Sequence, residues 1–103
     1  GQLTSHYAPR KPFYLGDLRD LYSKHKNEAP AIICFQNSLD ESPESAVFYL
    51  SKKGDTAEAA RNLFRLMREL DESDFGCILA EKLPESGLGP AINDRLKRAA
   101  AKS

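Results

Sequence analysis

The sequence lacks the features that mark several large classes of protein. Its 103 residues contain no apolar run near the ~20 residues needed to cross a bilayer, and its polar N-terminus has no signal-peptide core. The 15 Lys and Arg residues balance 15 Asp and Glu residues, so no net charge draws in nucleic acid or an anionic membrane. We therefore expect one small cytoplasmic domain with no membrane partner.

Residue types that carry catalysis or bind metals are also scarce. The two histidines, His6 and His25, are far apart and neither lies near a cysteine, so the ligand spacing of a metal site is missing. Cys34 and Cys77 each lie in a short apolar run, which favours buried free thiols over a disulfide, although spacing alone does not decide. No phosphate-binding loop and no nucleophile–base pair is recognisable. We expect no catalytic residue and no metal site here.

What the chain does contain is an alternation of strand and helix signals. Short runs rich in β-forming residues predict strands over 13–15, 31–35, 46–50 and 77–80. Amphipathic segments predict helices that begin at Asp17, Asp55 and Pro90. The order β-α-β-β-α-β-α predicts an α/β fold, a three-layer Rossmann-like sandwich with a mainly parallel sheet of about four strands. The connection over 36–45 has no clear helix, so a parallel crossover and an antiparallel return both stay open.

The middle helix has the strongest pattern of the three. Asp55 is expected to cap it, with Glu58 as the capping-box partner three residues on. Its predicted apolar stripe consists of Ala57, Ala60, Leu63, Phe64, Met67 and Leu70. The wider predicted core comprises Ile32, Ile33, Phe35, Val47, Phe48, Leu50, Phe64, Met67, Ile78 and Leu79, with Ile92 and Leu96 over one sheet face. As a buried aromatic residue, Phe64 would cost ~3–5 kcal/mol of stability on truncation to Ala.

The stretch "GLGPAINDRL" places two glycines just before a predicted helix start. Free backbone N–H groups at such a start can hold an anion, so Gly87, Gly89, Asn93 and Arg95 are candidates for an anion site or an interdomain contact. The same residues also fit a plain strand-to-helix turn, in which Asn93, Asp94 and Arg95 bond to nearby backbone or to one another. The pattern leaves both interpretations open.

Three segments in a fixed order, "HYAPRKP" (6–12), "GDTAEAARNLFRLMRELDE" (54–72) and "GLGPAINDRLKRAA" (87–100), carry a family resemblance. Together they resemble the C-terminal domain of the long, two-domain threonylcarbamoyl-AMP synthases. In that family a YrdC-type catalytic domain comes first, and a linker ending in His-Tyr-Ala-Pro leads to a Rossmann-like domain. The resemblance implies an interdomain linker remnant over 1–12 and a Rossmann-like domain over 13–103.

The resemblance also implies what the parent protein does. The full enzyme would make threonylcarbamoyl-AMP from threonine, bicarbonate and ATP with Mg²⁺, for the threonylcarbamoyl modification of adenosine beside the anticodon of tRNA. The YrdC-type domain is missing from these 103 residues, so we expect a piece of a longer protein that is not catalytic alone and holds no cofactor. The implied partners are the YrdC-type domain with its bound threonine and ATP, and proteins of the tRNA-modification pathway.

The opening segment receives its role from the same resemblance. His6, Tyr7, Ala8 and Pro9 match the linker motif, which in the family lies across the catalytic cleft and helps to close it. Pro9 and Pro12 restrict the backbone and favour an extended path. Without its partner the segment either frays or docks on this domain's own surface. The alternative function is a stand-alone α/β module that binds a small molecule or a nucleotide, which binding of ATP or AMP by this chain would favour.

Overall fold

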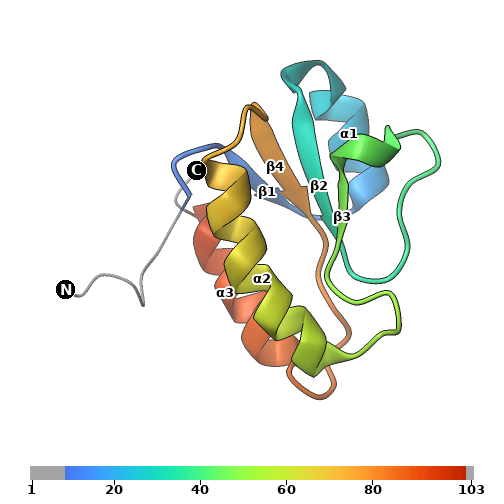
Figure 1. The fold of residues 1–103 in the computed structure, drawn as a ribbon, viewed down its shortest axis with the longest axis vertical. Coiled ribbons are helices and arrows are strands. Elements are labelled where there is room, and N and C mark those ends of the chain that lie inside the picture. The colour runs from blue at the N-terminus through green and yellow to red at the C-terminus, as the bar shows by residue number, and fades with distance from the viewer. Residues whose placement is uncertain (1–8, 102–103) are drawn as a thin grey trace.

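The computed structural model describes residues 9–101 (Figure 1). Within that range the chain forms the elements β1 (Phe13–Leu15), α1 (Leu18–His25), β2 (Pro30–Cys34), β3 (Val47–Tyr49), α2 (Thr56–Asp71), β4 (Cys77–Ala80) and α3 (Gly89–Ala101). Short 3₁₀ turns at Lys26–Glu28 and Glu44–Ala46 precede β2 and β3. The predicted order of strands and helices is confirmed.

The described strands form one sheet in the order β1-β4-β2-β3, and every neighbouring pair is parallel. The connection between β2 and β3 is therefore a parallel crossover and not an antiparallel return. Leu39, within this connection, packs against the same side-chain cluster as α1, so the crossover runs over the α1 face of the sheet. A parallel sheet needs cover on both faces, which explains why β2 and β4 are buried along their whole length.

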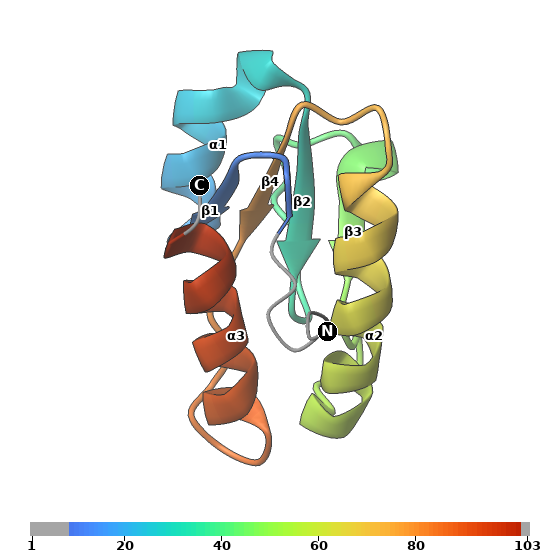
Figure 2. The same ribbon diagram turned by 90° about the vertical axis from the view of Figure 1, so that its left-hand side faces the viewer.

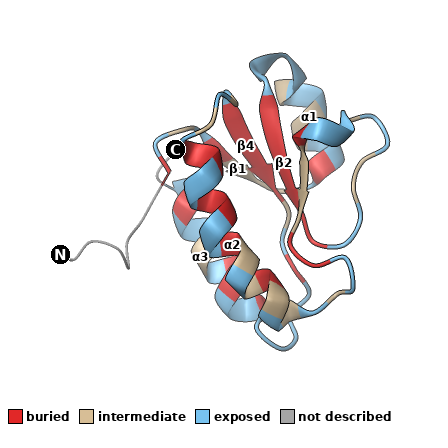
Figure 3. Ribbon diagram, in the orientation of Figure 1, coloured by how far each residue is buried: buried red, intermediate tan, exposed pale blue. Residues whose placement is uncertain are grey.

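Helices cover both faces of the sheet and produce three layers. Figure 1 shows α1 on one side of the strands and α2 with α3 on the other, and Figure 2 looks onto the face that α2 and α3 cover. Leu18 of α1 packs with Ile32, Cys34, Cys77 and Leu79 on the first face. The larger cluster on the second face joins the inner sides of α2 and α3 to alternate strand residues. Figure 3 shows the buried positions on these helices and on the central strands. The predicted three-layer α/β fold is confirmed.

Asp55 caps the N-terminus of α2, and Ser51, which the sequence analysis did not single out, takes part in the cap. The carboxylate of Asp55 accepts hydrogen bonds from the N–H groups of Ala57 and Glu58, at 2.9 and 3.4 Å. The hydroxyl of Ser51 accepts from the Asp55 N–H at 2.9 Å and donates to Glu58 Oε1 at 2.6 Å. Asp55 is the cap as predicted, but Glu58 reaches the Asp55 N–H through Ser51 instead of directly, which corrects the predicted capping box.

The buried face of α2 differs from the prediction. Phe64 is 51% exposed and Ala57 is exposed, so both leave the predicted stripe. The apolar residues that α2 does bury are Ala59, Leu63, Leu66, Met67 and Leu70. These positions also repeat at the helical period, and the choice between two overlapping stripes depends on where the sheet lies. Phe64 lies at the flank of the buried face, where its ring packs under the guanidinium of Arg95 with 4.2 Å between Cζ and the ring centroid.

The rest of the predicted core is mostly correct. Ile32, Ile33, Phe35, Leu50, Met67, Ile78, Leu79, Ile92 and Leu96 are buried. Val47 and Phe48 are half-buried because β3 lies at the edge of the sheet formed by residues 9–101, so one side lacks a neighbouring strand. Cys34 and Cys77 are free and buried, as predicted. Burial raises the pKa of each thiol to about 11. Between residues 9 and 101 no helix is both long and apolar enough to cross a membrane.

Candidate functional site

The first described residues are tied to the C-terminal end of α2 by one buried carboxylate. Asp71, the last residue of α2, has a side chain that is 3% exposed. Its Oδ1 accepts hydrogen bonds from the backbone N–H groups of Arg10 at 2.8 Å and Lys11 at 3.1 Å. Its Oδ2 lies 3.3 Å from Arg10 Nε. The helix dipole disfavours a negative charge at this end of a helix, and hydrogen bonds from these donors help to offset the cost of burying the carboxylate here.

Further contacts continue the attachment into the sheet. The Nζ of Lys11 donates to the carbonyl oxygen of Ser73 at 2.7 Å, and the N–H of Ile78 in β4 donates to the Pro12 carbonyl oxygen at 2.9 Å. Phe13, which follows, is 1% exposed. We call Pro9–Pro12 the anchor segment, because this stretch begins with the last residue of the His6–Pro9 motif and joins that motif to the body of the domain.

The contacts of the anchor segment show which part of the predicted linker, residues 1–12, is attached to this domain. Pro9 is buried, and it is the one residue of the His6, Tyr7, Ala8 and Pro9 motif that the structure describes. The other three lie outside the described residues. The sequence-based boundary after residue 12 stays a prediction, but the last four residues assigned to the linker contact this domain.

The predicted glycine-rich turn packs closely against its neighbours. Gly87 has φ +55°, and a Cβ added there would collide with Thr56 Oγ1. A Cβ on Gly89 would collide with the carbonyl oxygen of Pro84. The N–H of Leu88 donates to Thr56 Oγ1 at 3.0 Å, which ties the turn to the start of α2. Both glycines are required by the conformation or the space of this turn.

Asn93 holds the loop between β4 and α3. It is 2% exposed, accepts a hydrogen bond from the N–H of Leu83 at 2.8 Å and donates to the Leu83 carbonyl oxygen at 2.9 Å. Its amide also donates to Glu85 Oε2 at 2.8 Å. These contacts match the interpretation in which Asn93 bonds to nearby backbone.

Some of the backbone N–H groups that an anion would need at the start of α3 are already hydrogen-bonded or are absent. The N–H of Gly89 donates to Ser86 O at 2.8 Å, and Pro90 has no N–H. The structure therefore brings Gly87, Gly89 and Asn93 together in one turn, whereas Arg95 contacts Phe64. An anion or interdomain contact at these residues stays a prediction.

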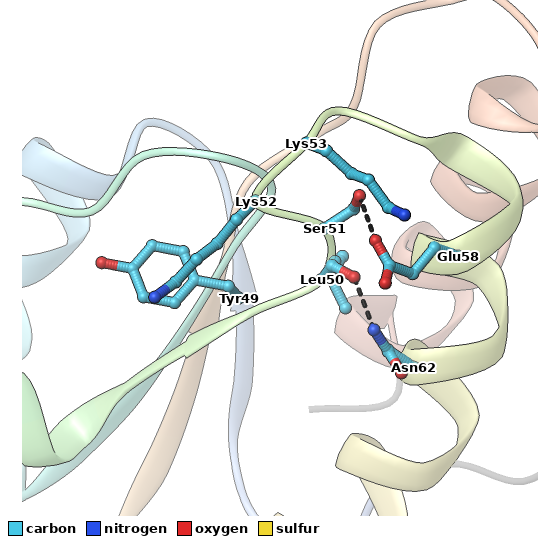
Figure 4. A pocket seen from close by; sticks show the side chains of 7 residues that line it. All are labelled: Tyr49, Leu50, Ser51, Lys52, Lys53, Glu58 and Asn62. Atoms are coloured by element: carbon cyan, nitrogen blue, oxygen red, sulfur yellow. Dashed lines mark hydrogen bonds between the residues drawn. The ribbon is translucent and has the colours of Figure 1, made fainter.

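A cavity that the sequence did not indicate lies at the C-terminal edge of the sheet, between β3 and the start of α2 (Figure 4). Its volume is about 430 Å³, and its lining consists of Tyr49, Leu50, Ser51, Lys52, Lys53, Glu58 and Asn62. The Asn62 amide donates to the Leu50 carbonyl oxygen at 2.7 Å, and Lys52 Nζ lies 4.6 Å from the centroid of the Tyr49 ring. Ligands of parallel α/β sheets bind beyond the carboxyl ends of the strands, which is where this cavity lies. In the sequence, the adjacent residues Lys52 and Lys53 after a predicted strand were a weak indication of this cavity.

Together these observations define an α/β domain whose N-terminal segment is tied to its surface. The family model described as "Threonylcarbamoyl-AMP synthase, C-terminal domain" matches residues 1–101, and the chain belongs to this family. The resemblance noted in the sequence is confirmed.

Individual relatives agree with this assignment. The threonylcarbamoyl-AMP synthase of Pyrococcus abyssi (strain GE5 / Orsay) is 34% identical over 109 residues, which cover 96% of this chain and 31% of the relative. The crystal structure of P. abyssi Sua5 complexed with L-threonine matches with a TM-score of 0.71 and 30% identity, over 92% of this chain and 29% of that chain. The structure of a P. abyssi Sua5 variant, in which a consecutive histidine and tyrosine are changed to alanine, matches with a TM-score of 0.68 and 30% identity, over 90% of this chain and 28% of that chain. This chain spans about a third of the length of these relatives.

Proposed function

We propose that this chain is the accessory C-terminal domain of an enzyme that makes threonylcarbamoyl-AMP from threonine, bicarbonate and ATP with Mg²⁺. A YrdC-type catalytic domain of the same protein binds threonine and ATP, and the His6–Pro9 motif closes its cleft. The product serves the threonylcarbamoyl modification of tRNA, together with other proteins of that pathway. Family membership supports the proposal, as does the relative whose structure is described as a complex with L-threonine.

The observation that carries the closing role is the anchor segment. A segment that covers a cleft needs a fixed base, and Asp71 holds the residues that directly follow the motif. This sequence contains one consecutive His-Tyr pair, His6-Tyr7. A consecutive His-Tyr pair is also what was changed to alanine in the P. abyssi Sua5 variant, which supports this pair as the working part of the segment.

The substitution Tyr7→Ala in the complete synthase tests the proposal. Tyr7 precedes β1, so we expect the melting temperature to change little while the turnover number for threonylcarbamoyl-AMP falls. Tyr7→Phe separates the ring from the hydroxyl, since Phe restores most of the rate if the ring alone acts. A matched control is Tyr22→Ala, which removes a partly buried tyrosine of α1 that lies outside both the motif and the cavity. Wild-type kinetics in Tyr7→Ala, or a large loss of stability with kinetics intact, would contradict the closing role.

A second candidate function is binding of a small anionic molecule or nucleotide by this domain itself. The cavity at the end of β3 favours it, because an aromatic ring and two lysines lie together there. A titration of AMP into this chain, followed by NMR at the Tyr49, Lys52 and Asn62 amides, distinguishes the two. Saturable chemical-shift changes at these amides would favour the second function. No change at millimolar AMP would contradict nucleotide binding at this cavity.

A further inference from the structure

We propose that the outer face of α2 and α3 binds single-stranded nucleic acid, with arginines that contact its phosphates and an aromatic ring on which a base stacks. The residues that carry this function are Arg61, Phe64 and Arg68 of α2 and Arg95 of α3, which we call the arginine face. The arginine face shares no residue with the cavity at the end of β3 or with the His6–Pro9 motif. Its function goes beyond the proposed role in threonylcarbamoyl-AMP synthesis and does not depend on it.

Two contacts show that α2 and α3 lie side by side and run in the same direction. Near the start of both helices, the Leu88 N–H donates to Thr56 Oγ1 at 3.0 Å. About two turns further along, the Arg95 guanidinium lies over the Phe64 ring, with 4.2 Å between Cζ and the ring centroid. Figure 2 shows the two helices next to each other over the sheet. Residues three and four positions apart share one side of a helix, so the two arginines of α2 flank the Phe64 ring.

The positive charges of the arginine face are not neutralised within the described part of the domain. Glu58 and Asp71 accept hydrogen bonds from residues outside α2 and α3, and the remaining carboxylates of these helices pair with other arginines on their own helix. Within residues 9–101 no ion pair includes Arg61, Arg68 or Arg95. Arg61 and Arg68 are exposed, so their guanidinium groups are available to an anionic partner. Guanidinium matches the geometry of a phosphate better than an ammonium group does.

The aromatic ring at the centre of the arginine face indicates which kind of anion fits. Phe64 is 51% exposed, and Phe64 and Leu88 are the large apolar residues that are exposed within residues 9–101. The Arg95 guanidinium packs on the Phe64 ring, and an unpaired base stacks on either an aromatic ring or a guanidinium plane. The bases of a duplex are already paired and stacked on one another. The exposed ring and its guanidinium therefore favour a single strand over a duplex.

The spacing and composition of the arginine face also favour nucleic acid over a protein partner. Arg61 and Arg68 lie about 10 Å apart along the axis of α2, a distance that a few successive nucleotides span. A specific protein interface takes about 800 Å² from each partner and has an apolar centre. Here arginines flank a single aromatic ring, and the other exposed large apolar residue, Leu88, lies about two turns away from Arg95 along α3. Cations interleaved with an aromatic ring are typical of a surface that follows a nucleic-acid strand.

The first experiment measures binding of fluorescein-labelled oligouridine and oligodeoxythymidine, each of about 12 nucleotides, to this chain by fluorescence anisotropy. We expect the Kd to rise about 20-fold between about 50 and 200 mM salt, because three phosphate contacts give a slope of about −2 for the logarithm of the binding constant against the logarithm of the salt concentration. Both strands present phosphates and unpaired bases, so saturable binding of either supports the proposal, and the ratio of the two Kd values identifies RNA or DNA as the ligand. No saturation by either strand up to about 1 mM protein at low salt would overturn the proposal.

The second experiment tests whether the arginine face is the binding site. The double variant Arg61→Glu/Arg68→Glu reverses two exposed charges, and we expect it to weaken binding about tenfold or more. The matched control Arg19→Glu/Lys24→Glu makes the same change in net charge on α1, on the opposite side of the sheet, where salt screens it from the arginine face. We expect this control to weaken binding about twofold at most. Equal losses in the two double variants would show that net charge alone accounts for binding, and would overturn the proposal.

Variants of Phe64 test the stacking of a base. Phe64→Leu removes the ring but keeps an apolar side chain, and should weaken binding about fivefold or more, whereas Phe64→Tyr keeps the ring and should bind like wild type. Because Phe64 is half-exposed, thermal unfolding should show that both variants remain folded. If Phe64→Leu binds both strands as tightly as wild type while Arg61→Glu/Arg68→Glu is impaired, the arginine face accepts anions of any kind, including an acidic protein surface, and the assignment to nucleic acid is wrong.

Discussion

Asn93 is expected to be a major source of stability in this domain. The substitution Asn93→Ala removes the partner of the buried N–H and the carbonyl oxygen of Leu83 at once. Each buried backbone group left without a partner costs about 1–3 kcal/mol, so we expect the free energy of unfolding to fall by about 2–6 kcal/mol. Urea denaturation followed by circular dichroism measures the loss, with the slope of the transition showing whether unfolding stays cooperative.

The neighbouring residue provides the control for this experiment. Asp94 is exposed, and its Oδ2 lies 3.1 Å from Arg98 Nη2 in a surface pair on the same helix. A pair of that kind contributes about 0.3–0.5 kcal/mol, so Asp94→Ala should stay close to wild type. Asn93→Asp keeps an acceptor for the Leu83 N–H but places a carboxylate against Glu85, and it should be at least as harmful as Asn93→Ala at neutral pH. A loss below about 1 kcal/mol in Asn93→Ala would refute the reasoning, because the Leu83 groups would then be satisfied by other means.

Two further predictions concern the core. Leu63→Ala should cost about 2–5 kcal/mol as a buried residue, whereas Phe64→Ala should cost about 1 kcal/mol or less, because it loses mainly a half-exposed cation–π contact with Arg95; equal losses in urea denaturation would contradict the assignment of the buried face. Burial raises the pKa of both cysteine thiols from 9.0 to about 11, so the unfolded chain loses these protons first, and the contribution of the thiols to stability should be constant well below pH 9 and fall between pH 9 and 11. The fall should be larger in wild type than in the double variant Cys34→Ala/Cys77→Ala, and the same slope in both would show that the thiols are not responsible.

The fold was predictable because its signals are local and repeated. The runs 31–35 and 77–80 are too continuously apolar for a strand with one solvent-exposed face, and they correspond to the two central strands, β2 and β4. The strand order was not predictable, since the connection over 36–45 carries no helix and its direction depends on contacts such as that of Leu39 with the α1 face. Phe64 was misplaced for a similar reason, because two stripes overlap on α2 and only the position of the sheet selects one.

The residues of the candidate functional site also differ in how far the sequence could predict them. The His6–Pro9 motif was visible because its family resemblance lies in consecutive residues. Asp71 was not, because the residues it binds are 60 and 61 positions away in the sequence and no local pattern joins them. The cavity at the end of β3 also depends on the packing of α2 against the sheet, although the pair Lys52 and Lys53 after a strand was a weak indication.

The strand order has a consequence for how the domain forms during synthesis. β4 lies between β1 and β2 and pairs with both, although it is the last strand to leave the ribosome. Until residues 77–80 emerge, β1 has no neighbour in the described sheet, and the loop that must close to bring β1 and β4 together spans most of the chain. The attachment of Arg10 to Asp71 closes a loop of nearly the same size. The N-terminal segment is thus fixed late, so in a longer protein any domain translated before it has time to fold while this segment is still free.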